Sequence, residues 1–345
     1  MTMLHQDGFD SYATAADLST EYGSVGADTL ISATGGRYGG PCLVGAGGAG
    51  SHTAYVSKTL SGTQTEIWTG FAASQSDNQQ HVIFSAFSLN GGINPEVSLW
   101  YNPLIGVFTA AIGQGNGNVI ASGTCTMGQE VYHWIEIHLN INPTVGIFEL
   151  WVDDQQIIMF AGNTASFGGT SIAALMLGGG NSLQALWDDW YILNLLGTVN
   201  NSRLGDSRIE TLLASADAGP NQGIPSNGTS HFAMIDEVDI DYNLSFLALP
   251  NTVGLKEVFD FNPMVTTPAN IWAVRVINVV EKTDGAVCNG AAYIESATVV
   301  GVGPDVPVLT TYFSVAGIFE TDPATGQPWA YPAVNAINAG LELVA

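Results

Sequence analysis

Hydrophobic and polar residues alternate along much of the chain, most clearly between residues 135 and 141. One set of alternate positions is aliphatic and the other is polar: Ile135, Ile137, Leu139 and Ile141 against Glu136, His138 and Asn140. Successive side chains of a β-strand point to opposite faces, so this pattern predicts a strand with one buried and one polar face.

The residues that follow predict a hairpin. The turn segment 142–146, NPTVG, carries Pro and Gly, and alternation resumes over 147–153. Similar segments recur at 52–60, 65–73, 81–89, 96–102, 105–113, 155–162, 172–177 and 185–193. Many short strands separated by turn residues, with almost no helical periodicity, predict an antiparallel sandwich of the jelly-roll kind.

The alternation stops after Leu193, where a polar segment rich in Asn and Gly begins. We therefore predict a first domain at 1–199 and a second, β-rich domain at 200–345. Strands are expected in the second at 207–214, 232–238, 257–261, 271–282, 291–300 and 309–320. The fold class expected is all-β, with two antiparallel β-sandwich domains.

One short helix is expected near the C-terminus. Ala330, Val334 and Ile337 share a helical face, Pro328 and Pro332 suit a first turn, and Gly340 suits the position after the last turn. Residues 341–345 would then form a terminal strand.

The net charge of the chain limits the classes of partner that it can bind. Seven Lys and Arg face 31 Asp and Glu, a formal net charge of -24, although only 11% of residues are charged and 46% are hydrophobic. Such a chain is folded, but it cannot neutralise nucleic-acid phosphates and is repelled by anionic membranes. The N-terminal MTMLHQDGFD lacks the basic and apolar stretches of a signal peptide, and no window is apolar enough for a membrane helix.

The polar face of the 135–152 hairpin carries the first candidate site. Glu136 and Glu149 can face each other there, together with His138 and Trp151. Carboxylates beside aromatic rings suit carbohydrate contact, because the ring packs on the sugar while the acid accepts hydroxyl hydrogens. A solvated strand face or a subunit interface explains the same pattern.

Two other acidic groups are candidates for catalysis or metal binding. Glu237, Asp239 and Asp241 alternate as glycosidase carboxylates do, but a solvated loop or a calcium site also explains them. In 186–193, LWDDWYIL, strict alternation would send Asp188 and Asp189 to opposite faces, which does not suit a catalytic pair. No catalytic residue and no cofactor is therefore assigned, with calcium kept as an alternative.

Several short motifs together resemble a group of tailed-bacteriophage virion proteins. They are DGFDSY at 7–12, GGRYGG at 35–40, YVSKTL at 55–60, WDDWYI at 187–192, GDSRIETL at 205–212 and ETDPATGQPW at 320–329. The resemblance implies an N-terminal concanavalin A-like lectin/glucanase sandwich, with WDDWYI as its last strand beside DGFD, and a second β-rich domain for virion attachment or assembly.

The function expected from this resemblance is a structural, non-enzymatic component of the virion, exposed on the particle surface. Its partners would be other virion proteins, further copies of itself and host surface glycans. Capsid decoration or head-fibre and tail-associated placements both remain open, although no collagen-like or coiled-coil shaft is present. The alternative is a polysaccharide depolymerase built on the same sandwich.

Overall fold

A computed structural model describes residues 2–46, 53–76, 80–88, 95–113, 118–166, 169–178, 183–238 and 240–344. The chain divides into two compact units, Met1–Ile209 and Glu210–Ala345. The first unit extends ten residues beyond the boundary expected from the sequence. It therefore includes the start of the GDSRIETL motif.

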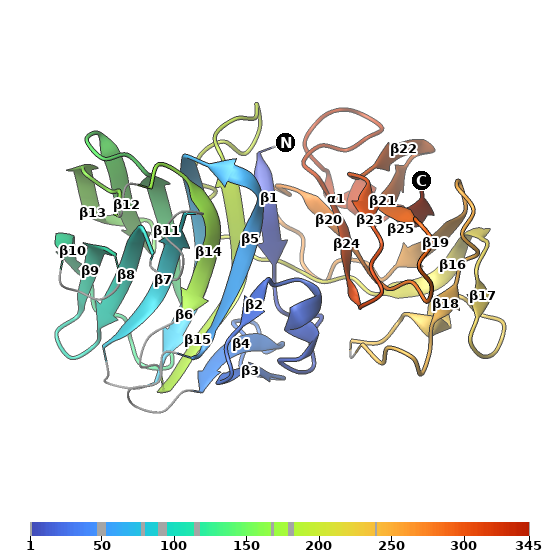
Figure 1. The fold of residues 1–345 in the computed structure, drawn as a ribbon, viewed down its shortest axis with the longest axis horizontal. Helices are drawn as coiled ribbons and strands as arrows, with labels where there is room; N and C mark the ends of the chain where they lie inside the picture. Colours follow the sequence, from blue (N-terminus) through green and yellow to red (C-terminus); the bar gives the residue numbers. More distant parts are fainter. Residues whose placement is uncertain are drawn as a thin grey trace. The chain divides into compact units, whose positions relative to one another are not determined.

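The first unit is a sandwich of two antiparallel sheets (Figure 1). One sheet, which we call sheet A, has eight strands. Their order is β13 (Gln155–Gly162), β12 (Gly146–Val152), β11 (His133–Asn140), β6 (Glu66–Gln75), β15 (Leu183–Asn194), β4 (Cys42–Ala46) and β3 (Thr29–Ser32), and β1 (Met3–Asp7) also pairs with β15. The WDDWYI strand therefore lies beside the N-terminal DGFD segment, as the resemblance implied.

The second sheet, sheet B, has seven strands. Their order is β10 (Val119–Thr124), β9 (Val107–Ile112), β8 (Val97–Asn102), β7 (His81–Phe87), β14 (Ile172–Gly178), β5 (Tyr55–Gln64) and β2 (Ser24–Val25). A short 3-10 helix, η1 (Asp17–Thr20), precedes β2.

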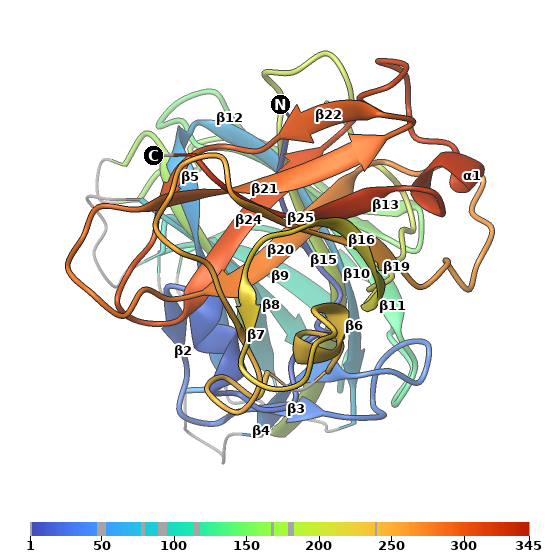
Figure 2. The same cartoon turned by 90° about the vertical axis from the view of Figure 1, so that its right-hand side faces the viewer.

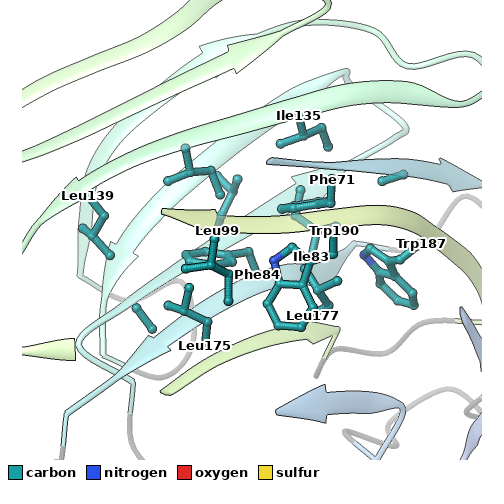
Figure 3. Close-up of a cluster of buried hydrophobic side chains, with 14 of the residues drawn as sticks. Phe71, Ile83, Phe84, Leu99, Ile135, Leu139, Leu175, Leu177, Trp187 and Trp190 are labelled. Carbon is teal, nitrogen blue, oxygen red and sulfur yellow. The ribbon is translucent and has the colours of Figure 1, made fainter. Parts of the chain in front are cut away.

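The core of this unit lies between the two sheets (Figure 3). It is formed by aliphatic and aromatic side chains of both sheets, including Phe71, Phe84, Leu99, Ile135, Leu139, Leu175, Trp187 and Trp190. Burying each large side chain of this kind contributes roughly 1.5–3 kcal/mol. The predicted hairpin is confirmed, because β11 pairs with β12 and Phe148, Leu150 and Val152 all point into the core.

The outer face of sheet A is not uniformly exposed. Glu136, Trp134 and Tyr191 lie outside the core cluster, yet their exposed fractions are 0%, 1% and 2%. Backbone and side-chain groups of residues 203–205 bond to this region, so the segment after β15 lies over the sheet. This segment completes the first unit.

The second unit is a smaller all-antiparallel assembly (Figure 2). Its main sheet, sheet C, has the order β16 (Ala214–Asn221), β19 (Lys256–Phe261), β25 (Asn338–Leu343), β21 (Asn289–Ser296) and β22 (Val299–Val302), with β23 (Val306–Pro307) also on β21. Two-stranded ribbons are formed by β20 (Val274–Val280) with β24 (Phe313–Phe319) and by β17 (Ile224–Pro225) with β18 (Leu247–Ala248). A small apolar core joins β20, β21 and β25 to the helix near the C-terminus.

That helix is present but shorter than the sequence pattern indicates. Helix α1 spans Tyr331–Val334, has Pro332 in its first turn, and ends at Asn335. Gly340 is not its terminator: it lies within β25, where a Cβ would stand 1.9 Å from the carbonyl oxygen of Glu257. Close strand approach, and not helix capping, requires glycine there.

The expected strands at 232–238 and 207–214 are wrong. The first is the 3-10 helix η2 (Phe232–Met234), and the second is an extended segment without strand pairing until Ala214. No helix among the described residues is long and apolar enough to cross a membrane.

Candidate functional site

The two adjacent aspartates of β15 do not follow the alternation expected from the sequence. The pairing with β6 shifts by one residue between Asp188 and Tyr191, and Asp189 has a φ of 54°. This bulge lets Trp187 and Trp190 both enter the core, although they are three positions apart. The prediction that Asp188 and Asp189 point to opposite faces is therefore wrong, and both line the same cavity.

Asp188 holds the loop formed by GGRYGG. Its Oδ2 accepts the backbone N–H of Arg37 at 2.8 Å, and its Oδ1 accepts the N–H of Asp189 at 2.9 Å. The loop itself closes through the Gly36 N–H to the Gly40 carbonyl at 2.8 Å, and Gly39 has a φ of 86°. A backbone φ in the left-handed region favours glycine, so Gly39 of the motif suits this turn.

Asp189 holds the start of GDSRIETL. Its Oδ1 accepts the N–H of Ile209 at 2.6 Å. Across the same region the Arg37 guanidinium binds Asp206 at 2.5 Å and donates to the carbonyl of Ser207 at 3.3 Å. Two loops that are far apart in the sequence are thereby fixed to one strand.

DGFDSY joins the same arrangement. A Cβ on Gly8 would stand 2.9 Å from the Ile209 carbonyl oxygen, and one on Gly40 would stand 2.7 Å from Oδ1 of Asp10. The motif's Asp7 is a buried anchor that accepts the hydroxyls of Tyr12 and Tyr22 at 2.7 and 2.8 Å. Four of the motifs that carry the resemblance are therefore in mutual contact.

These loops enclose a cavity of about 200 Å³, which we call the aspartate cavity. Its lining residues are Asp10, Tyr38, Gly39, Gly40, Asp188, Asp189, Arg208 and Ile209. Asp188 and Asp189 are buried in the cavity wall, whereas Tyr38 and Arg208 are exposed, with the Arg208 guanidinium 4.3 Å from the centroid of the Tyr38 ring.

Burial changes the acidity of both aspartates. The pKa of Asp188 and the pKa of Asp189 are both raised to about 7. Desolvation by burial is the largest cause, and a negative neighbour adds to it in each case: Asp189 for Asp188, and Asp10 for Asp189. Backbone N–H groups and Arg37 oppose this shift.

One oxygen of this pair has no hydrogen bond. Asp189 is 2% exposed, and its Oδ2 accepts no hydrogen bond from the described residues. The Arg37 Nη1 lies 3.7 Å away, beyond the range of a hydrogen bond.

The residues expected on the hairpin's polar face do share one face of sheet A. Glu136 is paired with Trp151, and His138 with Glu149, across β11 and β12. Glu136, however, is completely buried: it accepts hydrogen bonds from the Tyr191 hydroxyl at 2.6 Å, the Gly205 N–H at 2.9 Å and Arg203 at 2.8 Å. Burial raises its pKa, and Tyr191 and Arg203 oppose the shift.

His138, Glu149 and Trp151 stay partly exposed. The His138 ring stacks on Trp68 with centroids 4.5 Å apart and lies 2.8 Å from Glu66 and 3.5 Å from Glu149. The Arg203 guanidinium lies 4.5 Å from the centroid of the Trp151 ring. Residues 203–205 thus cover Glu136. His138, Glu149 and Trp151 remain the candidates for carbohydrate contact on this face.

The acidic group of the second unit is held by one hydroxyl. Ser245 Oγ lies 2.8 Å from Glu237 and 2.7 Å from Asp241, whereas Asp239 lies outside the described residues. Within the part of the chain that is described, no three His, Cys, Asp or Glu side chains are placed to hold a metal ion.

Sequence reasoning missed the aspartate cavity. Asp188 and Asp189 were considered, but a bulge has no signature in the alternation itself. The signal available was the spacing of the two tryptophans: a strand whose large aromatics stand three apart must gain one residue to bury both.

No protein-family model matches the chain, and no curated protein matches it. Solved structures similar to it include an endo-β-1,4-glucuronan lyase from Trichoderma reesei, at 14% identity and a TM-score of 0.40, covering 50% of this chain and 91% of its own. Another is the cellulose-induced protein Cip1, at 13% identity and a TM-score of 0.42, covering 59% and 100%. A Bacillus subtilis protein with a galectin-like fold has 9% identity and a TM-score of 0.40, covering 56% and 98%. Likeness at this level does not carry an activity to the chain.

Proposed function

We propose that this protein is a structural component of a tailed-phage virion, exposed on the particle surface, and that its N-terminal sandwich contacts glycans. Its partners are other virion proteins and further copies of the same chain. Placement on the head, as decoration or head fibre, and placement on the tail are both compatible with this proposal.

One observation carries it: four motifs of the resemblance form a single hydrogen-bonded arrangement. DGFDSY, GGRYGG, WDDWYI and GDSRIETL are separated by up to about 200 residues, yet they meet around Asp188 and Asp189. Because these motifs contact one another in the first unit, they support the resemblance jointly and not as isolated short matches.

The experiment is localisation on particles of the phage that encodes the chain. Antibodies against residues 210–345 should label intact virions in electron micrographs, and mass spectrometry of purified virions should detect the chain. Labelling over the head supports a decoration or head-fibre role, and labelling of the tail supports a tail-associated role. Absence of the chain from purified virions overturns the proposal.

A second candidate is a polysaccharide depolymerase, favoured by two carboxyl groups with raised pKa values in one cavity. Glycosidase carboxyls must be free to meet the glycosidic oxygen and a water or sugar carbon. Here three of the four carboxylate oxygens already accept backbone N–H groups. The anchoring role therefore has the stronger support.

Enzymatic activity is tested by incubating the protein with bacterial capsular polysaccharides and measuring new reducing ends. We expect none. Release that disappears in Asp189→Asn but persists in Glu149→Gln would instead establish the depolymerase.

A further inference from the structure

We propose that Asn227 is a site of spontaneous covalent modification, at which the side-chain amide is converted to a carboxylate through reaction with the backbone of Gly228 and then with water. The site lies in a turn of the second unit. The inference goes beyond the proposed virion role and does not depend on it.

The sequence contains Asn-Gly steps at 90–91, 116–117, 227–228 and 289–290. The first two lie outside the described residues. Asparagine followed by glycine is the step at which the main chain most easily attacks the side-chain amide, because glycine has no side chain to shield its nitrogen and restricts the backbone least. The two described steps can therefore be compared within one unit.

The turn that holds Asn227 leaves the reacting groups accessible. Asn227 and Gly228 are both exposed, and they lie in a bend outside any strand or helix. The N–H of Gly228 donates no hydrogen bond to a described residue, and a Cβ added to Gly228 would meet nothing within 4 Å. The attacking nitrogen is thus not held by a hydrogen bond, and the asparagine is open to water.

Hydrogen bonds hold the chain on both sides of this turn. The Ser226 N–H donates to the Phe246 carbonyl at 2.9 Å, and the Ser226 hydroxyl oxygen accepts the Phe246 N–H at 3.0 Å. On the other side, the N–H of His231 donates to Asp217 at 3.1 Å. Residues 227–229 form the exposed tip between these anchors, and a covalent change at such a tip is tolerated without unfolding the unit.

Asn289 and Gly290 provide the contrast. Both lie in β21, where Gly290 is buried and pairs with Leu343 on one side and with Val306 on the other. The Asn289 carbonyl accepts the Val344 N–H at 3.0 Å. A backbone held in a paired, extended strand cannot fold back on its own side chain, so local opening must precede the reaction. The same dipeptide is therefore protected in β21.

The reaction needs no reactant other than water. The Gly228 nitrogen loses its proton to solvent and forms a bond to Cγ of Asn227. The bond from Cγ to the side-chain nitrogen breaks, so ammonia leaves and a succinimide ring remains. Water then adds to one of the two ring carbonyl carbons, and the bond from that carbon to the ring nitrogen breaks. The product at position 227 is aspartate or isoaspartate, and either one adds a negative charge to the turn.

The test is peptide mapping by mass spectrometry of the purified full chain during incubation at pH 8 and 37 °C, with digestion at acidic pH to stop the reaction. We expect conversion at Asn227 to be at least about tenfold faster than at Asn289, because Asn289 reacts only after local opening. In denaturing urea the two should react at similar rates. The rate at Asn227 should fall between pH 8 and pH 6, because the attacking nitrogen must lose a proton.

Two variants separate this reaction from other chemical damage to the chain. Gly228→Ala places a methyl group beside the attacking nitrogen and should slow the conversion severalfold. Asn227→Gln has a longer side chain that must form a larger ring, so position 227 should remain unmodified over the same time. Circular dichroism checks that both variants are folded.

Three outcomes overturn the inference. They are no conversion at Asn227 in the folded chain, equal rates at Asn227 and Asn289 in the folded chain, and conversion in Gly228→Ala as fast as in the unaltered chain. None of the three bears on whether the chain is found in purified virions, so the two proposals fail separately.

Discussion

Two regions of the first unit hold the chain after β15 in place with buried carboxylates, but they do so differently. Around Glu136 the three described donors, from Tyr191, Arg203 and Gly205, occupy both carboxylate oxygens. Asp188 and Asp189 lie side by side, and Oδ2 of Asp189 accepts no hydrogen bond from the described residues. A single carboxylate with donors on both oxygens stabilises structure, whereas two adjacent buried carboxyls favour retention of a proton.

The largest expected effect on stability comes from removing the Glu136 carboxylate. Glu136→Ala removes the acceptor for a buried hydroxyl, a backbone N–H and a guanidinium, which we expect to cost about 3 kcal/mol. For a unit of this size that corresponds to a fall in Tm of about 6 °C or more. Thermal unfolding followed by circular dichroism measures it.

The matched control is Glu149→Gln on the same sheet face. Its ion pair with His138 spans 3.5 Å and is partly exposed, so we expect a loss within about 0.5 kcal/mol. Equal losses of stability in the two variants would refute the stabilising role assigned to the buried Glu136 carboxylate.

The next effect is a pH dependence of the crowded pair. In the unfolded chain both aspartates ionise near their ordinary pKa of about 4, while in the folded chain they retain protons up to about 7. The folded state therefore binds more protons between these values, and stability falls as pH rises through this window. We count one retained proton for this interacting pair, which corresponds to a loss of about 2–3 kcal/mol between pH 5 and pH 8.

A variant of Asp189 separates the titration of the aspartate pair from that of the other titratable groups around it. Asp10, Arg37, Tyr38, Asp206 and Arg208 surround it, with Tyr132 and Cys42 beside Asp188. Asp189→Asn removes one carboxyl and should flatten the Tm profile between pH 5 and pH 8. An unchanged slope would attribute the dependence to the overall negative charge.

The smallest effect concerns the packing of DGFDSY on the segment after β15. In Gly8→Ala the new methyl group would stand 2.9 Å from the Ile209 carbonyl oxygen, so we expect a loss of about 1–2 kcal/mol. Gly285→Ala, where a Cβ meets nothing within 4 Å, should change stability by less than about 0.5 kcal/mol. Chemical denaturation of both variants compares them directly.

The sequence predicted the sheets well because burial imposes a period of two. Ile135, Ile137 and Leu139 alternate regularly, and the structure places all three in the core. It failed where other forces set the local structure: Phe232 and Met234 form a 3-10 turn, and Gly340 serves strand packing. The candidate site was missed for a similar reason, because the bulge at Asp189 and the position of Arg208 depend on tertiary packing. Only the three-residue spacing of Trp187 and Trp190 indicated the bulge.

The anchoring of residues 203–209 also determines where the first unit can be joined to another domain without losing stability. A recombination joint placed where the strands stop, near residue 195, would separate the sandwich from the residues that cover Glu136 and bond to Asp189. The structural unit is therefore the sandwich together with residues 195–209, and we expect fusions of this unit to other domains to fold when the joint lies at or beyond residue 210.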